Sequence, residues 1–167
     1  MIPTQQCDIA IVETPVDELT HDIEIFRFEC VSILPKEHPL AIHDVLSPEL
    51  VAAYPFVALY HEHPTTLQLE RAFLARKMPW DPVIETRLFA SNCEIVVKGT
   101  GISIVDPMTA DQYTQSAIAI RRFEPRIVHE VAVMFPEKGP RSRLTSDFVA
   151  LLKQEVQPFL LEREATS

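Results

Sequence analysis

The chain has 167 residues, a length typical of one domain or of two small lobes. Its formal net charge of −9 argues against binding of DNA or an anionic membrane by this chain alone, because phosphate binding needs a basic face. No apolar run approaches the roughly 18 residues of a membrane span, and the N-terminus lacks the basic start of a signal peptide. The three cysteines, Cys7, Cys30 and Cys93, have no metal-ligand spacing, and we interpret them as reduced thiols of a cytoplasmic protein.

Short apolar strands separated by prolines are predicted in the first part of the chain. Pro15 ends the first strand, and Pro35 and Pro39 break the chain after the next two. Ser47-Pro48 places an N-cap before a proline in the first helical position, which predicts a short helix. The predicted strands are 8–12, 23–28, 30–34 and 56–60, and the predicted helix is 48–53.

A polar segment with His61 and His63 precedes the next predicted helix. The two imidazoles point the same way on an extended chain, but zinc needs three or four ligands and the spacing marks no third one. The pattern therefore favours a polar loop at the mouth of a cleft over a metal site. Pro64 suits the first helical position, whereas Thr65 can instead form a capping box with Gln68, and the sequence leaves both helix starts open.

The stretch from residue 91 to residue 107 organises the chain. Ser91 and Glu94 form a capping box that predicts a helix start, and Gly99 suits the left-handed residue that ends a helix. Gly101 then leads into the β-branched segment 102–105, which predicts a buried strand. Two interpretations stay open: ordinary turn chemistry inside an α/β layer, or a cleft in which the Ser91 end of the helix offers N–H groups to an anion.

The rest of the chain continues the alternation of strands and helices. The loop at 137–141 carries the third glycine, and Pro158 is expected to kink the last helix or to end its regular part. Strands are predicted at 83–89, 117–123 and 127–135 and helices at 109–115 and 142–163, the last with an apolar stripe of Leu144, Phe148, Leu151, Leu152, Val156 and Phe159. The alternation predicts an α/β fold with one largely parallel sheet or two such sheets.

The sequence marks little catalytic chemistry. It contains no Gly-x-Ser-x-Gly elbow and no phosphate loop, and Gly99-Thr100-Gly101 precedes a strand rather than following one, unlike a dinucleotide fingerprint. The cysteines lack a neighbouring histidine motif, which favours a buried role over a nucleophilic one. We therefore predict no catalytic residue, no metal and no cofactor. The prediction is a binding module whose polar groups gather at helix starts: Thr65, Thr66, Ser91, Asn92 and the turn 106–109.

The order of several motifs resembles the effector-binding (substrate-binding) domain of LysR-type transcriptional regulators. The family's Asp-Leu-Ala-Ile strand resembles residues 8–11, and its Pro-x-x-His-Pro-Leu-Ala segment matches 35–41. The family's Val-x-x-Gly-x-Gly-Ile matches 96–102, and its Ser followed six residues later by Phe matches Ser142 and Phe148. These motifs follow the family's order across nearly the whole chain, which is identified as a member of that family.

A finer resemblance rests on 104–110 (IVDPMTA) and 121–123 (RRF). These segments are similar to the subgroup that contains the diaminopimelate-responsive LysR protein and the octopine and nopaline catabolism regulators, which implies an effector resembling an amino acid or an opine. The resemblance implies two Rossmann-like lobes, as in type 2 periplasmic binding proteins, with the effector between them. It implies that lobe I comprises 1–30 and 121–167 and that lobe II comprises 31–120.

The family's effector contacts carry over to the loop after the strand that ends at Tyr60 and to the beginning of the organising helix. They imply ligand-binding roles for Thr65, Thr66, Ser91 and Asn92, with Pro107 and Met108 as further candidates.

The chain shows no counterpart of the family's N-terminal winged helix-turn-helix, its linker helix, or the first strand and helix of lobe I. We therefore expect an N-terminally truncated effector sensor with an incomplete lobe I. We also expect a homo-oligomer that reaches DNA only through the missing helix-turn-helix domain and has no membrane partner. Two alternatives stay open: a free-standing solute-binding protein without a DNA role, and a small hydrolase or transferase that uses His61, His63 or Cys93.

Overall fold

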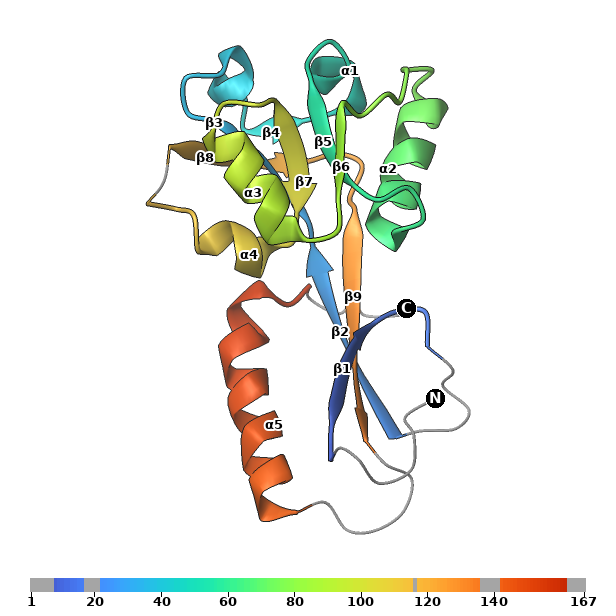
Figure 1. Ribbon diagram of the computed structural model, residues 1–167, viewed down its shortest axis with the longest axis vertical. Coiled ribbons are helices and arrows are strands. Elements are labelled where there is room, and N and C mark those ends of the chain that lie inside the picture. The colour runs from blue at the N-terminus through green and yellow to red at the C-terminus, as the bar shows by residue number, and fades with distance from the viewer. Residues whose placement is uncertain (1–7, 17–21, 116, 136–141, 162–167) are drawn as a thin grey trace, which may run out of the picture. The chain divides into compact units, whose positions relative to one another are not determined.

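The structure of the chain, a computed structural model, describes residues 8–16, 22–115, 117–135 and 142–161 and confirms the α/β class (Figure 1). It divides into two compact units, Met1–Phe28 with Glu130–Ser167 and Glu29–His129. The chain passes from the first unit to the second within β2 (Asp22–Glu29) and returns within β9 (Val128–Phe135). The division into lobes at residues 30 and 120 stays a prediction.

The first unit contains a three-stranded sheet in the order β1-β9-β2 and one long helix. β1 (Ala10–Glu13) is antiparallel to β9. α5 (Arg143–Val156) is capped by Ser142, whose side chain accepts the N–H of Thr145 at 3.0 Å, and an ion pair of 2.5 Å joins its Lys153 to Glu24 on β2. The 3-10 turn η2 (Gln157–Phe159) follows and contains Pro158, so of the two effects predicted for Pro158 the structure shows the end of the regular helix rather than a kink within it.

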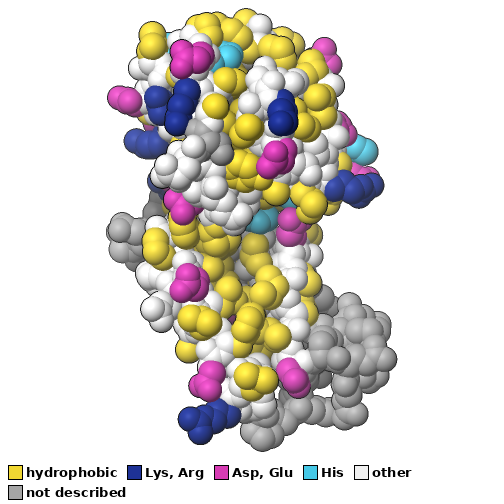
Figure 2. Space-filling model, turned by 60° about the vertical axis from the view of Figure 1, so that its left-hand side comes forward, with side chains coloured by type: hydrophobic (Ala, Val, Ile, Leu, Met, Phe, Trp, Pro, Cys, Tyr) yellow, Lys and Arg dark blue, Asp and Glu magenta, His cyan; other side chains and the backbone are white. Residues whose placement is uncertain are grey.

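The apolar stripe predicted for α5 is only partly buried. Among the described residues the helix buries Thr145, Val149 and Val156, which recur at spacings of four and seven. Leu144, Phe148 and Leu151 are 80%, 44% and 55% exposed, so the predicted burial of these three residues is wrong. The physical reason is that Leu144, Phe148 and Leu151, at spacings of four and three, form a second apolar stripe next to the one that carries Val149 and Val156, and only the latter stripe is buried. Figure 2 shows hydrophobic side chains gathered on the exposed face of this unit.

The second unit is built on a six-stranded sheet in the order β4-β8-β3-β7-β5-β6. β5 is parallel to β6 and β7, and β4 is parallel to β8, whereas β3 is antiparallel to both β7 and β8. The sheet is therefore mixed rather than largely parallel, because β3 follows β2 directly and enters the sheet against the direction of its neighbours. The strands are β3 (Val31–Pro35), β4 (Val45–Leu46), β5 (Phe56–Leu59), β6 (Ile84–Thr86), β7 (Ile102–Val105) and β8 (Ile118–Phe123).

Helices cover both faces of this sheet, as Figure 1 shows. α1 (Pro48–Val51) and α2 (Pro64–Ala75) pack on one face, and α3 (Phe89–Val97) and α4 (Pro107–Asp111) pack on the other. β7 illustrates why: Ile102 and Ile104 belong to one apolar cluster and Val105 to the other. Strands buried on both faces have continuous apolar sequences, which is why the apolar segments 56–60 and 102–105 correctly predicted strands.

The helix–turn–strand stretch forms as predicted at its end but not at its start. The N–H of Gly99 donates to the carbonyl oxygen of Val96 at 2.9 Å, and that of Thr100 donates to Ile95 at 3.2 Å, which is a Schellman motif with Gly99 at φ +88°. The predicted capping box of Ser91 and Glu94 is wrong, because the N-cap is Leu88, three residues before Ser91, and it makes no side-chain cap. The helix includes Phe89 because, at spacings of four and seven from Cys93 and Val96, its side chain extends the buried face of the helix.

Two predictions, on membrane spans and on the loop at 137–141, remain to be compared with the residues that the structure describes. None of the helices among these residues is long and apolar enough to cross a membrane. The predicted loop at 137–141 lies outside the described residues.

Candidate functional site

The carboxyl ends of three neighbouring strands lie at one edge of the second unit's sheet. β6, β5 and β7 are neighbours and parallel, and α3, α2 and α4 follow them respectively (Figure 1). Helix N-termini favour anions through their N–H groups and dipoles, and open α/β sheets bind ligands outside the carboxyl ends of their strands. We call this the carboxyl edge and define it by residues 60–66, 87–92 and 106–109 with Cys30, which precedes β3.

α2 begins at Pro64 and is capped by His63. The Nδ1 atom of His63 accepts the N–H of Thr65 at 3.1 Å, and Pro64 occupies the first helical position, where the missing N–H costs no hydrogen bond. Gln68 forms no capping box with Thr65. Its amide instead accepts the N–H of Val128 at 2.9 Å and donates to the carbonyl of Val128 at 2.8 Å. Of the two helix starts that the sequence left open, the structure selects Pro64.

Thr65 and Thr66 are both buried in the first turn of α2, but their hydroxyls differ. Thr66 Oγ1 donates to the carbonyl oxygen of Leu59 at 3.0 Å and thereby fastens α2 to the end of β5. Thr65 is 1% exposed, and its Oγ1 has no normal hydrogen-bond partner among the described residues. Its polar neighbour is the thiol of Cys30, a weak hydrogen-bonding group. An unpaired buried hydroxyl costs about 1–3 kcal/mol, and a thiol compensates little of that cost, so the Thr65 hydroxyl remains available to a stronger acceptor.

The start of α4 lies near Cys30 as well. Asp106 is 4% exposed, and its Oδ1 caps the helix by accepting the N–H of Thr109 at 2.9 Å. Burial raises the pKa of the Cys30 thiol far above its ordinary value, and the Asp106 carboxylate raises it further. Pro107 and Met108 are the first two helical residues and are half-buried. The helix predicted from residue 109 thus begins at Pro107, because Asp106 supplies the cap.

Ser91 and Asn92 lie inside α3 rather than at its start. Ser91 is the third helical residue, and its N–H donates to the carbonyl oxygen of Leu88 at 3.0 Å. Asn92 is fully buried; its Oδ1 accepts the hydroxyl of Thr86 at 2.6 Å, and its Nδ2 donates to Ser103 Oγ at 3.0 Å. The structure therefore brings Thr65 and Thr66 to a helix start at the carboxyl edge, and it places the Asn92 amide in a network that joins α3 to β7.

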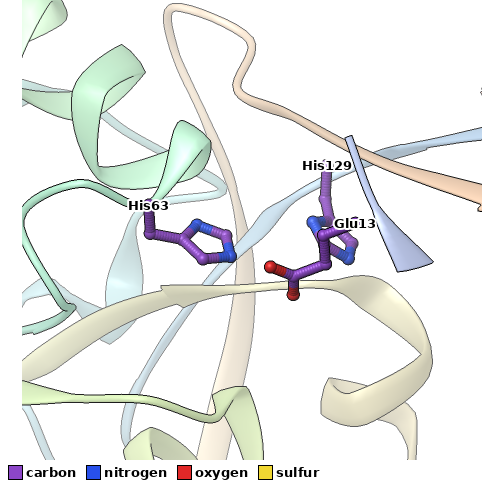
Figure 3. Close-up of side chains that lie close together, drawn as sticks. All are labelled: Glu13, His63 and His129. Carbon is purple, nitrogen blue, oxygen red and sulfur yellow. The ribbon is translucent and has the colours of Figure 1, made fainter. Parts of the chain in front are cut away.

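Sequence reasoning missed His129. Its ring stacks on that of His63 with centroids 6.0 Å apart, and Phe89 contacts both rings edge-on at 5.1 and 5.7 Å. Figure 3 shows the two imidazoles, one from the start of α2 and one from β9; Glu13, also drawn there, is a residue of the first unit. Ile127 and His129 are both buried, and residues two apart in an extended segment point to the same side. This spacing was the signal in the sequence that the His129 side chain is buried.

The residues considered for nucleophilic chemistry differ in their surroundings. The side chain of His61 is 76% exposed, 3.8 Å from Glu85, as expected of a polar surface loop. Cys93 is fully buried, and burial, followed by the Asp106 carboxylate, raises the pKa of its thiol to about 12. A thiol with that pKa stays protonated at neutral pH, which argues against Cys93 as a nucleophile.

Comparison with known proteins places this geometry in a family. A family model described as LysR substrate binding domain matches residues 1–157. The transcriptional activator protein LysR of Escherichia coli (strain K12) is 30% identical over 148 residues, which are 88% of this chain and 48% of that protein. The regulatory protein NocR of Agrobacterium tumefaciens (strain T37) is 29% identical over 125 residues, 75% of this chain and 42% of that protein.

A solved structure shows the same fold. The CcmR regulatory domain of Synechocystis PCC6803, solved in complex with 2-PG, has a TM-score of 0.70 and 19% sequence identity, and the match covers 90% of this chain and 74% of that chain. The chain belongs to the LysR substrate-binding domain family and has the type 2 periplasmic-binding-protein-like fold, which confirms the resemblance drawn from its motifs. The chain spans about half the length of the curated relatives it matches.

Proposed function

We propose that the carboxyl edge contributes to the binding site of a small anionic effector whose negative group lies at the start of α2. The observation that carries this proposal is the hydroxyl of Thr65, buried and without a normal partner in the first turn of a twelve-residue helix. An anion gains there from the helix dipole and from a charge-assisted hydrogen bond with that hydroxyl. Binding would also remove the cost of leaving the hydroxyl unpaired.

The proposed effector is an amino acid or an opine, which carries a carboxylate. The similarity to LysR and NocR supports this class, and the complex of the CcmR domain with 2-PG shows that a domain of this fold takes a small ligand. The proposed contacts are Thr65, Thr66, Ser91, Pro107 and Met108. For Asn92, whose amide is engaged within the protein, the proposed role is to hold α3 in place.

The proposal for the whole protein is a cytoplasmic transcription regulator that acts as a homo-oligomer. The relatives are named as a transcriptional activator and a regulatory protein, and both are about twice as long as the matched part. DNA binding would then belong to a helix-turn-helix domain outside this chain, which agrees with the net charge of −9. Effector binding would bias the conformations that such an oligomer adopts on DNA.

The test starts with a thermal-shift screen of amino acids, diaminopimelate and opines, followed by calorimetry of the best ligand with two variants. Thr65→Val removes the unpaired hydroxyl at nearly constant volume. The matched control, Ser103→Ala, removes a buried hydroxyl that pairs with Asn92 in the interior of the same sheet.

The two variants are expected to separate stability from affinity. Thr65→Val should weaken ligand binding about tenfold and leave the free protein as stable as the wild type, or more stable by about 1 kcal/mol. Ser103→Ala should bind the ligand normally and lose about 1 kcal/mol of stability. Unchanged affinity in Thr65→Val would contradict the proposed site.

A further inference from the structure

A cavity of the second unit lies away from the carboxyl edge. It has a volume of about 640 Å³ and lies between the segment Lys36–Ile42 and the strand β8. β3 begins at the carboxyl edge and ends at Pro35, and Pro35 is paired with Ile118 at the start of β8, so the cavity opens at the opposite edge of the sheet. A volume of roughly 300–1,000 Å³ is typical of small-ligand sites.

This cavity is basic although the chain is acidic. Lys36, Arg121 and Glu37 line it, so two positive charges face one negative charge, a net charge of +1 in a chain of −9. Six other cations of the described chain each lie within 4.0 Å of a carboxylate: Arg27, Arg76, Arg122, Arg126, Arg143 and Lys153. Within the described ranges Lys36 and Arg121 form no such pair, and neither do Arg71, Lys77, Arg87 and Lys98, none of which lines this cavity.

The guanidinium of Arg121 is held in place by carbonyl oxygens. Its Nε and Nη2 donate to the carbonyl of Ala41 at 3.1 and 2.5 Å, and its Nη1 donates to the carbonyl of Ile120 at 2.8 Å. These bonds use three of the five N–H donors of a guanidinium and leave its full charge uncompensated. A fixed cation with donors to spare is pre-organised for a carboxylate or a phosphate, because little side-chain freedom is lost on binding.

The remaining lining residues supply an apolar surface and a neutral donor. Ile42, which is 84% exposed, and the buried Ile118 are both among the lining residues. His38 accepts the N–H of Leu40 on Nδ1 at 3.2 Å, and burial lowers its pKa, so the neutral ring carries its proton on Nε2. Two segments recognised by their motifs, 35–41 and 121–123, thus meet in one cavity.

We propose that this cavity binds a small organic anion, with its carboxylate held by Arg121 and Lys36 and its apolar part against Ile42 and Ile118. The proposal is independent of the effector site, because it concerns the opposite edge of the sheet and different residues. The residues that line the cavity indicate the class of ligand. Lys36 and Arg121 favour an anion, and the exposed Ile42 favours an organic anion with an apolar chain over an inorganic anion.

The experiment is a titration of the ¹⁵N-labelled chain with hexanoate, followed in ¹⁵N–¹H spectra, with hexylammonium, which also has six carbons, as a probe of opposite charge. We expect hexanoate to shift the amides of 36–42 and 117–121 saturably and hexylammonium to leave them in place. Arg121→Gln should raise the dissociation constant of hexanoate at least tenfold, and Lys36→Gln about threefold.

The matched control is Arg122→Gln, which removes the same charge from the next strand position, where the side chain is 66% exposed and pairs with Glu124. It should bind hexanoate as the wild type does. The proposal is overturned if these amides do not saturate, if hexylammonium shifts them equally, or if Arg122→Gln weakens binding as much as Arg121→Gln. Should Arg121→Gln fail to fold, the exposed Lys36→Gln decides alone: an unchanged dissociation constant overturns the proposal.

Discussion

The two glycines of the turn between α3 and β7 should respond very differently to alanine. Both have positive φ, +88° at Gly99 and +73° at Gly101, where a Cβ atom costs about 1–2 kcal/mol. A Cβ on Gly99 would meet nothing within 4 Å, whereas one on Gly101 would lie 2.2 Å from the carbonyl oxygen of Pro55. Only Gly101→Ala therefore adds a steric clash to the backbone strain.

The size of that clash follows from what it displaces. The Pro55 oxygen accepts the N–H of the fully buried Ile102 at 2.9 Å, so moving it by about 1 Å breaks a hydrogen bond at the start of β7. Overpacking costs about 1–3 kcal/mol and the lost bond about 1 kcal/mol. We expect Gly99→Ala to lower the free energy of unfolding by about 1–2 kcal/mol and Gly101→Ala by about 3–5 kcal/mol.

Urea denaturation followed by circular dichroism measures both values. The two variants should share the m-value of the wild type and differ in their midpoints. Equal destabilisation of the two variants would show that the contact between a Cβ atom on residue 101 and the Pro55 oxygen adds nothing to the loss in free energy of unfolding. That result would refute the reasoning.

Three further predictions concern the second unit. Lys77 has φ +58°, so Lys77→Gly should raise the free energy of unfolding by about 0.5–1 kcal/mol in urea melts, and a loss of stability would contradict the left-handed strain. Asn92→Ala leaves the buried hydroxyl of Ser103 without its partner, whereas Thr86 keeps the carbonyl oxygen of Leu88 as an acceptor, and it should cost about 1–3 kcal/mol; a near-neutral result would mean that the network contributes little. The hydrogen bond from Arg76, with a smaller one from Ser47, lowers the pKa of Glu49 to about 2. Because this folded pKa lies below the ordinary value of 4.5, the pair contributes stability above that value and loses it as the pH falls toward 2. Carboxyl NMR titration should find that Arg76→Gln raises the pKa of Glu49, and an unchanged pKa would contradict the assigned cause.

Local chemistry accounts for the elements that the sequence predicted well. The Schellman turn at Gly99, the apolar strands of the second unit and the end of α5 at Pro158 each depend on a few neighbouring residues. The start of α3 was placed too late because Ser91 and Glu94 satisfy a capping pattern, whereas burial of Phe89 decides where the helix begins. Tertiary packing here overrides a local signal of about 1 kcal/mol.

Contacts between distant segments were not predictable from one sequence. The bonds of Arg121 to Ala41 join positions 80 residues apart, and no pattern in either segment marks the other. The same holds for the face of α5: its periodicity shows two apolar stripes, and only the sheet determines which one is covered. The sequence identified Thr65 as a candidate ligand contact. Only the folded structure shows that its hydroxyl lacks a normal hydrogen-bond partner.

The central claim is that a small anion binds at the start of α2, and the most direct measurement is a map of the perturbed amides. The ¹⁵N-labelled chain would be titrated with the amino acid or opine that stabilises it most in the thermal-shift screen, where saturation at 100 times the dissociation constant adds about 2.7 kcal/mol. We predict saturable shifts at residues 60–67 and 106–109, and their loss in Thr65→Val at the same ligand concentration. Shifts confined to 36–42 and 117–121, or a map that Thr65→Val leaves unchanged, would contradict the claim.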